Sequence, residues 1–470
     1  MKGDSYQPPG EEDYELHTVK TSSHDDTETL MTKSEGKDDM YDVSWNGHSI
    51  RMYDANYKKY SMVGWQIAFS LIIFGIFGLN DQATGALMPT LLDHYGISMV
   101  TASNIFLIQL VGYLFASALN ERVHRWFGVR GAMLAVCILC FIPYGILTIA
   151  PPSFYIYLFC MFPIGLGLGI ADSGANVLIG NLTVNRNEWM GILHAVYGGT
   201  SMVTPPIASY FVKWNHWSIF FLIPTTAALI NILIIPMAFP YETAMKYNYI
   251  ATIGHEDDAN LKDIDETNIF QVLKNPVVAL YAAYMFLLLG GEITTGSWFL
   301  TYLLKTKSNK RIAMSYVSSS FWTGITVGRL CLGFVTHRFF KNEYTASNIY
   351  SWLSVLLYTI FVALGFSFFD NVFYFILMYI TLFFAGFFIG PLSPNSSIVA
   401  IQNLPQKLHI SGVGLAVAIG GCGGAALPYI SGIIINNVGE TIIPTLLWVM
   451  VLAFTLVWCL YPRYIPSLRQ

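Results

Sequence analysis

The sequence predicts an all-α membrane protein whose twelve transmembrane helices form two halves of six helices each. The 470 residues are 54% hydrophobic and only 11% charged, whereas soluble domains carry roughly 25% charged residues. Twelve apolar stretches are long enough to cross a bilayer, which takes about 20 helical residues. A faint repeat relates the first six stretches to the last six. These three observations favour a membrane bundle over a soluble domain.

The predicted membrane helices follow one another along the chain, mostly with short loops between them. We place them at residues 64–92, 98–120, 131–150, 154–182, 190–212, 217–238, 277–304, 312–338, 348–368, 371–400, 411–436 and 440–461. The longest polar interruption separates the sixth helix from the seventh. The predicted organisation is therefore an N-terminal tail (1–60), a first half (61–240), a cytosolic loop (241–275), a second half (276–462) and a short C-terminus (463–470).

The tail is polar and acidic, with too few apolar residues to form a core, so we expect it to be disordered. We expect both termini in the cytosol, because the number of spans is even and Lys and Arg concentrate on the N-terminal side of the membrane. We favour the plasma membrane, with the vacuolar membrane as the alternative. The loops on the other side of the membrane from the termini contain only five basic residues: Lys213, Lys305, Lys307, Lys310 and Arg311.

Small residues recur at equivalent places in the two halves. Gly112 and Arg122 have the same spacing as Gly328 and Arg338. The other matching sets are Gly165 and Gly169 with Gly386 and Gly390, and Gly198 and Pro206 with Gly420 and Pro428. Small residues let helices approach closely, and proline marks bends. We therefore expect these positions to pack in the same way in both halves.

Two acidic residues lie inside predicted membrane helices. Asp81 belongs to the first helix and Asp172 to the fourth. A carboxylate at the centre of a membrane helix costs about 2.5–3.5 kcal/mol, so we expect both to face a wet interior. A buried carboxyl group that is exposed to each side in turn can take up a proton and release it. Asp81 and Asp172 are therefore our candidates for proton coupling.

Polar side chains accompany both acids. Asn80 and Gln82 flank Asp81 in an otherwise apolar stretch. Asn176 lies four residues after Asp172, which places the two on one helix face. We predict that these polar side chains line a substrate cavity.

Glu292 and Arg329 are further charges at membrane depth, in the seventh and eighth helices. Their distances from the ends of the helices, at a rise of about 1.5 Å per residue, place them at similar depths, so we expect them to pair. A pair that only fixes packing is one interpretation. In the other, Arg329 binds the substrate and Glu292 acts as its gate partner.

Other candidates for substrate contact come from the fifth, seventh and tenth helices. Histidine titrates near neutral pH as a residue type, so His194 is a candidate for relaying protons or binding substrate, although a structural role at the membrane interface is slightly favoured. Tyr197 follows it on the same helix. Trp298 and Trp322 are candidate rings for stacking on a sugar. The alternative is that these rings only pack inside the protein. Asn395 faces Asn176 if the repeat holds.

Several motifs resemble the fucose–proton symporter branch of the major facilitator superfamily. They are LNDQATGALMP at 79–89, GLGLGIADSGAN at 165–176, LHAVYGG at 193–199 and GGEITTGSW at 290–298. The resemblance covers the membrane part and not the tail, and it includes fungal members of the branch. It implies the 6+6 fold and proton coupling through Asp81 and Asp172, with Asn176 beside the site.

The segment Glu121–Arg130 resembles the basic loop that superfamily members carry between the second and third spans. The resemblance implies a cytosolic gate made of Glu121, Arg122, Arg130 and the equivalent Arg338. The alternative is that the segment is an ordinary cytosolic loop, because loops on that side of a membrane are rich in Lys and Arg in any case.

The leading hypothesis is a proton symporter for a small polar solute such as a monosaccharide, working as a monomer by alternating access. A nutrient sensor on a transporter fold and a carrier of organic anions or other small metabolites are the alternatives. The sequence lacks a P-loop motif and a basic stripe, so we expect neither an ATP-driven pump nor a nucleic-acid partner. We expect no enzymatic activity, cofactor or metal, since no nucleophile–base pair or metal-ligand spacing stands out.

Overall fold

The computed structural model describes residues 40–257, 273–367, 371–404 and 409–464. The chain divides into two units, one up to Tyr53 and one from Asp54 onward. The first unit contains an antiparallel hairpin of β1 (Tyr41–Trp45) and β2 (His48–Met52). Disorder was expected for this stretch, so that expectation is wrong for residues 41–52, and residues 1–39 lie outside the described residues.

The hairpin has a local cause. Asn46 and Gly47 both have positive φ, 50° and 77°, which is the geometry of a two-residue hairpin turn that Asn-Gly sequences favour. Val43 pairs with Ile50 across the strands, and both side chains are buried. The turn and one apolar pair therefore form a hairpin within a stretch that composition alone describes as polar.

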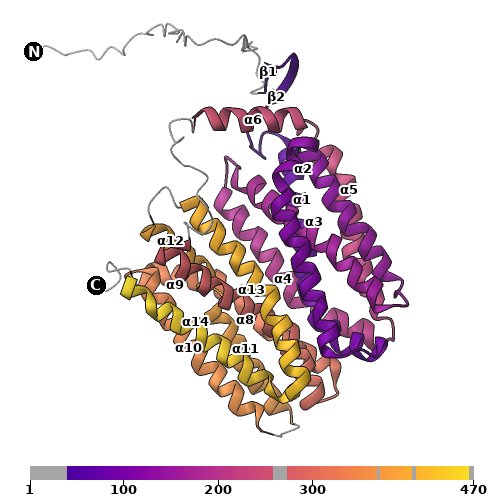
Figure 1. Ribbon diagram of the computed structural model, residues 1–470, viewed down its shortest axis with the longest axis vertical. Helices are drawn as coiled ribbons and strands as arrows, with labels where there is room; N and C mark the ends of the chain where they lie inside the picture. Colours follow the sequence, from indigo (N-terminus) through magenta and orange to yellow (C-terminus); the bar gives the residue numbers. More distant parts are fainter. Residues whose placement is uncertain (1–39, 258–272, 368–370, 405–408, 465–470) are drawn as a thin grey trace, which may run out of the picture. The chain divides into compact units, whose positions relative to one another are not determined.

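The second unit is helical (Figure 1). Its first part contains α1 (Ser61–Tyr95), α2 (Met99–Thr148), α3 (Phe154–Gly180), α4 (Arg186–Lys213), η1 (Trp217–Phe221), α5 (Leu222–Ala238) and α6 (Ala244–Asp257). Its second part contains α8 (Pro276–Thr306), α9 (Arg311–Phe339), α10 (Glu343–Gly365), α11 (Val372–Ile389), α12 (Leu392–Asn403), α13 (His409–Val438), η4 (Glu440–Ile442) and α14 (Ile443–Tyr464).

The predicted fold class is confirmed. Nine helices in the described ranges are long and apolar enough to cross a membrane. One of them, α2, has 50 residues and contains two crossings, because its backbone breaks at Gly128 (φ 68°, ψ 178°). The helices α4 and α9 add two crossings of lower hydropathy. This is expected for helices whose polar residues face the other half. The twelve crossings match the twelve predicted stretches.

The bend at Gly128 also receives the connector between the halves. A side chain at Gly128 would lie 2.4 Å from the Thr243 carbonyl carbon, so the close approach of the connector requires glycine. Arg130 N–H donates to the Glu242 carbonyl (3.0 Å), and the Asn248 amide donates to the Arg125 carbonyl (3.1 Å). We call this end of the bundle the connector end, and the end with the α1–α2 and α8–α9 turns the distal end.

The predicted repeat is visible in the packing of α2 on α3 and of α9 on α11. An added side-chain carbon at Gly112 would lie 2.3 Å from the Phe162 carbonyl oxygen, and one at Gly328 would lie 2.0 Å from the Phe387 carbonyl oxygen. Gly198 and Gly420 differ, contrary to expectation. Gly198 faces Thr326 of the other half, whereas Gly420 faces α8 of its own half.

The two halves meet along α1–α8, α4–α9 and α2–α13. The α1–α8 contact is backbone to backbone, because a carbon added at Gly85 would lie 2.3 Å from the Gly296 carbonyl oxygen. Towards the distal end, the Arg311 guanidinium donates to the Ala86 carbonyl (2.7 Å), and Lys305 pairs with Asp93 at 3.8 Å. All of these contacts lie in the middle or distal part of the bundle.

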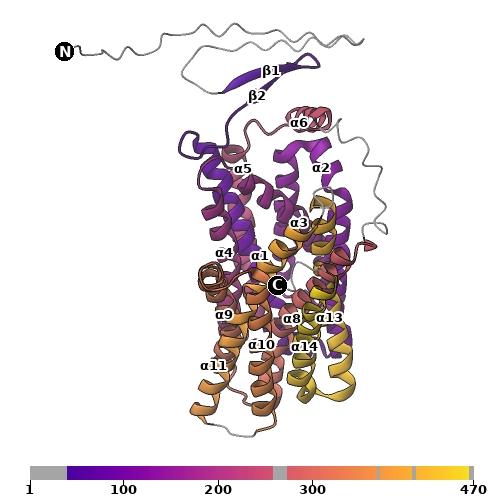
Figure 2. The same cartoon turned by 90° about the vertical axis from the view of Figure 1, so that its left-hand side faces the viewer.

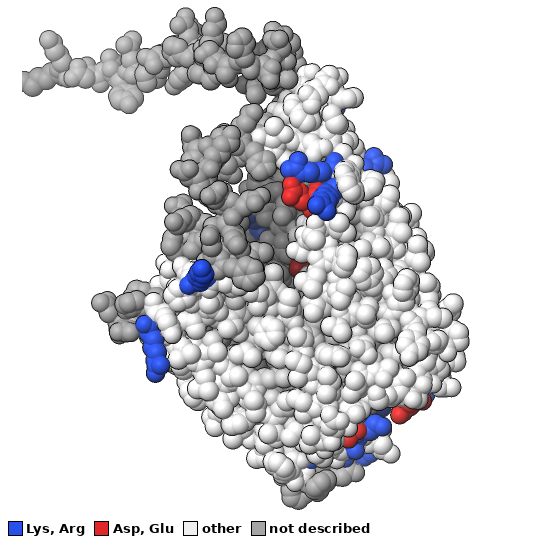
Figure 3. Space-filling view, in the orientation of Figure 1, with Lys and Arg blue, Asp and Glu red and all other residues white. Residues whose placement is uncertain are grey.

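The connector end is hollowed. Figure 3 shows an opening there between the halves, with basic and acidic side chains visible inside it. A groove of about 810 Å³ also follows α9 from Arg329 to Arg338. The helices of the two halves run side by side along the bundle in Figure 1, and Figure 2 looks onto the second half with the first half behind it. We call the hollow between the halves the central cavity; it is open at the connector end and closed at the distal end.

Candidate functional site

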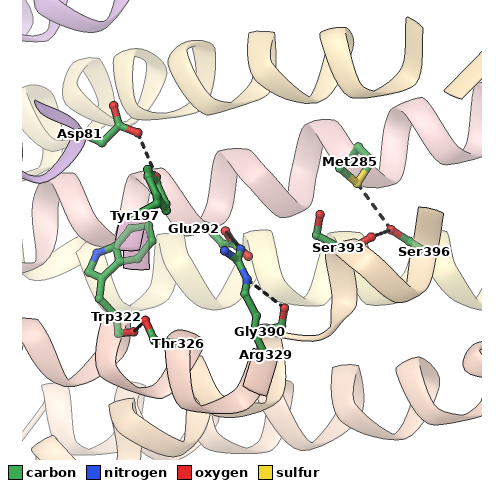
Figure 4. Close-up of polar contacts among 10 residues, drawn as sticks. All are labelled: Asp81, Tyr197, Met285, Glu292, Trp322, Thr326, Arg329, Gly390, Ser393 and Ser396. Atoms are coloured by element: carbon green, nitrogen blue, oxygen red, sulfur yellow. Dashed lines mark hydrogen bonds and ion pairs between the residues drawn. The ribbon is translucent and has the colours of Figure 1, made fainter. Parts of the chain in front are cut away.

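Asp81 lies on α1 in the middle of the bundle and has three polar partners. Its carboxylate accepts a hydrogen bond from the Tyr197 hydroxyl at 3.0 Å (Figure 4). It also accepts one from the Asn80 amide at 3.4 Å. The Gln109 side chain is its third partner. The Asn80 amide oxygen in turn accepts from the Tyr144 hydroxyl at 3.0 Å, which fixes the orientation of that amide.

Asp172 on α3 has a similar environment. Its carboxylate accepts from the Tyr113 hydroxyl and from the Asn176 amide, both at 3.0 Å. The Asn176 amide also donates to the Asp172 carbonyl at 2.9 Å, as their spacing of four residues allows. The face that we predicted for Asp172 and Asn176 therefore exists, and Asn176 orients the acid.

Asp81 and Asp172 belong to one electrostatic cluster. The two carboxylates interact with each other, and Tyr113 interacts with both. Both aspartates are partly exposed to solvent, although they lie deep inside the bundle. Because a lipid-facing carboxylate would be strongly unfavourable, this partial exposure is consistent with side chains that border the central cavity.

The predicted pairing of Glu292 with Arg329 is present. The Arg329 guanidinium lies 3.5 Å from the Glu292 carboxylate and also donates to the Gly390 carbonyl at 3.3 Å (Figure 4). The Glu292 side chain is almost fully buried, and its Oε1 atom lacks a hydrogen-bond partner among the described residues. Arg329 is partly exposed and reaches the groove along α9.

Two predicted substrate contacts have packing positions instead. The Trp298 ring is completely buried, and its indole N–H donates to the Pro428 carbonyl at 3.0 Å. Asn395 is buried and donates to the Ser347 hydroxyl on α10 at 3.2 Å, so it does not face Asn176. The backbone stays helical through Gly390 and Pro391, between α11 and α12, and Asn395 lies on the side of this span that contacts α10.

His194 and Tyr197 occupy different environments on α4. The His194 side chain is exposed, and its ring makes an edge contact with Phe74, with the centroids 5.6 Å apart. Tyr197 contacts both halves. Its hydroxyl donates to Asp81 of the first half, and its ring lies edge-on to Trp322 of the second half, with the centroids 6.2 Å apart. Of the two candidate stacking rings, Trp322 is therefore the one that contacts Tyr197.

Gln82 lies at the contact between the halves. A carbon added at Gly296 would lie 2.7 and 2.8 Å from the two amide atoms of Gln82, and 2.9 Å from the Trp322 indole nitrogen. Gln82 and Trp322 are buried, and these polar atoms have no hydrogen-bond partner in the part of the chain that the structure describes. The same holds for the Ser297 hydroxyl.

The predicted gate residues lie at the connector end. Glu121 pairs with Arg125, one helical turn away, at 2.8 Å, and that pair is exposed. Arg122, Arg130 and Arg338 are also exposed. Their role as a gate stays a prediction.

The sequence did not identify Tyr113, Tyr144 or Gln109 as site residues. The chain has 28 tyrosines, so one more tyrosine in an apolar helix carries no signal of its own. Only the packing of α2 against α1 and α3 brings these side chains to the acids. Within the described residues, no three His, Cys, Asp or Glu side chains gather as a metal site would require.

The sequence has clear relatives. It is 48% identical to "Bypass of stop codon protein 6" of Saccharomyces cerevisiae over 98% of both chains. It is 24% identical to a glucose/mannose transporter of Bacillus subtilis over 80% of this chain and 89% of the relative. The family model of the Major Facilitator Superfamily matches residues 70–407.

Solved structures share the fold. A D-xylose–proton symporter superposes with a TM-score of 0.67 at 13% identity, covering 86% of this chain and 98% of the symporter. A POT family transporter in complex with 5-aminolevulinic acid gives 0.64 at 14% identity, with 87% and 97% covered. The matched family model and the 48% identity along nearly the whole chain establish that this protein is a multi-pass membrane transporter of the Major Facilitator Superfamily.

Proposed function

We propose that the protein is a proton-coupled symporter that carries a small uncharged polar solute, such as a monosaccharide, by alternating access. The observation that carries this proposal is the pair of tyrosine-bound aspartates. Asp81 and Asp172 come from separate helices, belong to one electrostatic cluster and are partly exposed deep in the bundle. Charges at this depth generally mark ion or proton pathways.

The tyrosines suit a reversible proton site. Each hydroxyl donates to a carboxylate, which stabilises the ionised form without adding a positive charge. A neutral donor competes less with an incoming proton than a paired cation would, because a nearby positive charge favours the ionised carboxylate more strongly. Asp81 and Asp172 are therefore better suited to carry the coupled proton than Glu292, which faces Arg329.

The proposed solute binds next to Asp81, between the halves. Asn80, Gln82, Tyr197, Glu292 and Arg329 surround this position. The preference for a sugar is supported by the 24% identical glucose/mannose transporter, since that similarity extends over most of both chains. Asn176 and His194 lie nearer the connector end, where a solute would pass.

The orientation that we propose has both termini in the cytosol, so that the connector end is the cytosolic end and the present conformation faces inward. The plasma membrane remains our preferred location, with the vacuolar membrane as the alternative. We propose that the monomer is the working unit.

Uptake driven by a pH gradient tests the proposal. In proteoliposomes with an acidic exterior, wild-type protein should accumulate labelled D-glucose, D-mannose or D-xylose above equilibrium. Asp172→Asn and Asp81→Asn should abolish this accumulation, because an amide cannot carry the proton. Asp172→Asn should still exchange sugar across the membrane, since Asn retains the polar contacts of the site.

The control is Glu188→Gln, which changes an exposed carboxylate in the first turn of α4. It should accumulate sugar as the wild type does. Full gradient-driven accumulation by Asp172→Asn would contradict the coupling role, and no transport of any of the three sugars by the wild type would contradict the proposed substrate class.

A further inference from the structure

The groove that follows α9 at the connector end combines positive charge with apolar surface. It has a volume of about 810 Å³ and is lined by Arg329, Leu330, Gly333, Phe334, His337 and Arg338. Three of these side chains are basic, two are large and apolar, and none of the described residues in the lining is acidic. The groove therefore has room for a ligand that carries both an anionic group and an apolar chain.

The groove extends from the α4 side of α9 to the outer surface of the bundle. Gly328 packs against the α11 backbone, and Thr326 faces Gly198 of α4. His337 follows Thr326 by about three helical turns and lies on the same face. Phe334 is 81% exposed and is turned by about 120° from Gly328 and about 80° from Thr326 around the helix. Its ring therefore faces neither neighbour, as expected for a side chain that meets lipid.

The chemistry of the lining changes with depth in the membrane. Thr326 lies near the middle of α9, and at a rise of about 1.5 Å per residue Arg338 lies about 18 Å further along the helix. Half of the hydrocarbon core is about 15 Å thick, so His337 and Arg338 reach the level of the lipid headgroups. Leu330 and Phe334 lie about 6 and 12 Å from the middle, at the level of the acyl chains.

We propose that this groove is a binding site for one phospholipid with an anionic headgroup. The phosphate lies between His337 and Arg338, and one acyl chain lies over Gly333 along Leu330 and Phe334. In the proposed orientation this end of the bundle meets the cytosolic leaflet, which contains the anionic lipids, and basic pockets between membrane helices on that side suit such headgroups. Lipid binding goes beyond the proposed function, and measuring it requires neither a solute nor a coupled ion.

The apolar part of the lining favours a lipid over a soluble anion. A free phosphate would contact only the basic end of the groove and would leave Leu330 and Phe334 uncovered. The general excess of Lys and Arg on the cytosolic side of membrane proteins also explains His337 and Arg338. That explanation predicts no preference of this groove for one lipid over another, so the two accounts differ in a measurable way.

Native mass spectrometry of the full-length protein in detergent tests the charge of the site. Dioleoylphosphatidylserine should bind with one high-affinity site per protein, and dioleoylphosphatidylcholine should bind there several-fold more weakly. Arg338→Gln should weaken the binding of phosphatidylserine by about fivefold, the effect expected for one basic group beside an anionic lipid. The control is Lys213→Gln, which removes an exposed basic residue from the last turn of α4 and should leave the binding unchanged.

Gly333→Leu tests the shape of the site, because the leucine side chain fills the groove. A carbon added at Gly333 has no neighbour within 4 Å among the described residues, so leucine fits without displacing them. Leucine also favours helix over glycine. The variant should therefore keep the unfolding midpoint of the lipid-free protein and lose the preference for phosphatidylserine.

Gly145→Leu is the matched control for this substitution. Gly145 also has open space around the added carbon, but it lies on α2 and outside the groove. The control should bind phosphatidylserine as the wild type does.

Inorganic phosphate separates a lipid from a soluble anion, because a large molar excess of it should not displace phosphatidylserine. Displacement by phosphate, equal binding of the two lipids, or unchanged binding in Gly333→Leu would each overturn the lipid site. None of these results would affect the proposed sugar transport. Absence of sugar accumulation in the proteoliposomes would in turn leave the lipid site standing.

Discussion

Asp81 and Asp172 each accept a hydrogen bond from a tyrosine hydroxyl at 3.0 Å, whereas Glu292 faces the Arg329 guanidinium at 3.5 Å. The three acids therefore have two kinds of environment. The tyrosine hydroxyls place no positive charge beside the aspartates, as the proposed proton site requires. Arg329 neutralises the charge of Glu292, which favours a lasting ion pair.

The Glu292–Arg329 pair predicts unequal effects of its two single substitutions. Arg329→Ala leaves a buried carboxylate without its cation, and the loss of one partner of a buried pair costs about 3–5 kcal/mol. Glu292→Gln leaves a partly exposed guanidinium that still donates to the Gly390 carbonyl. We expect Arg329→Ala to lower the unfolding midpoint of the purified protein far more than Glu292→Gln does.

The double variant Glu292→Gln/Arg329→Ala is the control, and it should recover most of the stability that Arg329→Ala loses. Equal falls of the unfolding midpoint in the two single variants would contradict the prediction that the two substitutions differ in cost. Uptake by the stable variants separates the two interpretations of the pair, because unimpaired uptake in both would exclude a role in substrate binding.

At the residue scale, sequence reasoning succeeded where a charge was improbable and failed where the residue type was common. Asp81, Asp172, Glu292 and Arg329 stand out in apolar helices, and the structure gives each of them a polar partner. Tyr113 does not stand out among the tyrosines of this chain. Trp298 and Trp322 also cannot be ranked from sequence, because only packing determines which ring borders the site.

At the scale of the helices, glycine positions determine where backbones touch. Gly112 and Gly328 allow α2 to approach α3 and α9 to approach α11, and Gly85 allows α1 to approach α8. Gly128 differs from these because its φ of 68° lies in the left-handed region and because the connector passes directly over it. It fixes both the bend of α2 and the docking of α6.

Replacement of Gly128 should therefore destabilise the bundle at the connector end. Gly128→Ala places a methyl group 2.4 Å from the Thr243 carbonyl carbon. It also forces alanine into a backbone conformation (φ 68°, ψ 178°) that is essentially confined to glycine and costs about 1–3 kcal/mol. We expect a clear fall in the unfolding midpoint and faster proteolysis within residues 241–257. An unchanged midpoint and digestion pattern would contradict the assigned role.

The matched control is Gly145→Ala, in the second crossing of α2. This glycine has no neighbouring atom within 4 Å of the added carbon, and alanine favours helix by about 1 kcal/mol over glycine. The control should therefore keep or raise the unfolding midpoint.

Helix positions were predictable because about 20 consecutive apolar residues leave few alternatives in a membrane protein. The α2 bend was predicted as a loop at the right place. Two elements were not predicted: the helix α6 within the expected loop 241–275 and the hairpin within the expected tail. Both depend on local contacts, which the average composition of a segment does not reveal. The hydrogen bond from Asn395 to Ser347 on α10 is likewise a contact that the repeat alone does not predict.

At the scale of the whole transmembrane unit, α4 of the first half packs against α9 of the second half. The two helices touch near their middles, at Gly198 and Thr326. The distal closure lies on one side of this contact, at Gly85–Gly296, Arg311–Ala86 and Lys305–Asp93. The central cavity opens on the other side. The arrangement supports a rocking motion of the halves about the α4–α9 contact, in which one end closes as the other opens.

Distances between spin labels on α4 and α9 test this motion most directly. One pair of labels replaces Arg186 and Phe339 at the connector end, and the other replaces Lys213 and Lys310 at the distal end; all four positions are exposed. Measured in lipid nanodiscs with and without D-glucose, at acidic and alkaline pH, each pair should show two distance populations. The account predicts that conditions which shorten the connector-end distance lengthen the distal-end distance. A single fixed distance in both pairs, or a change of the same sign at both ends, would contradict it.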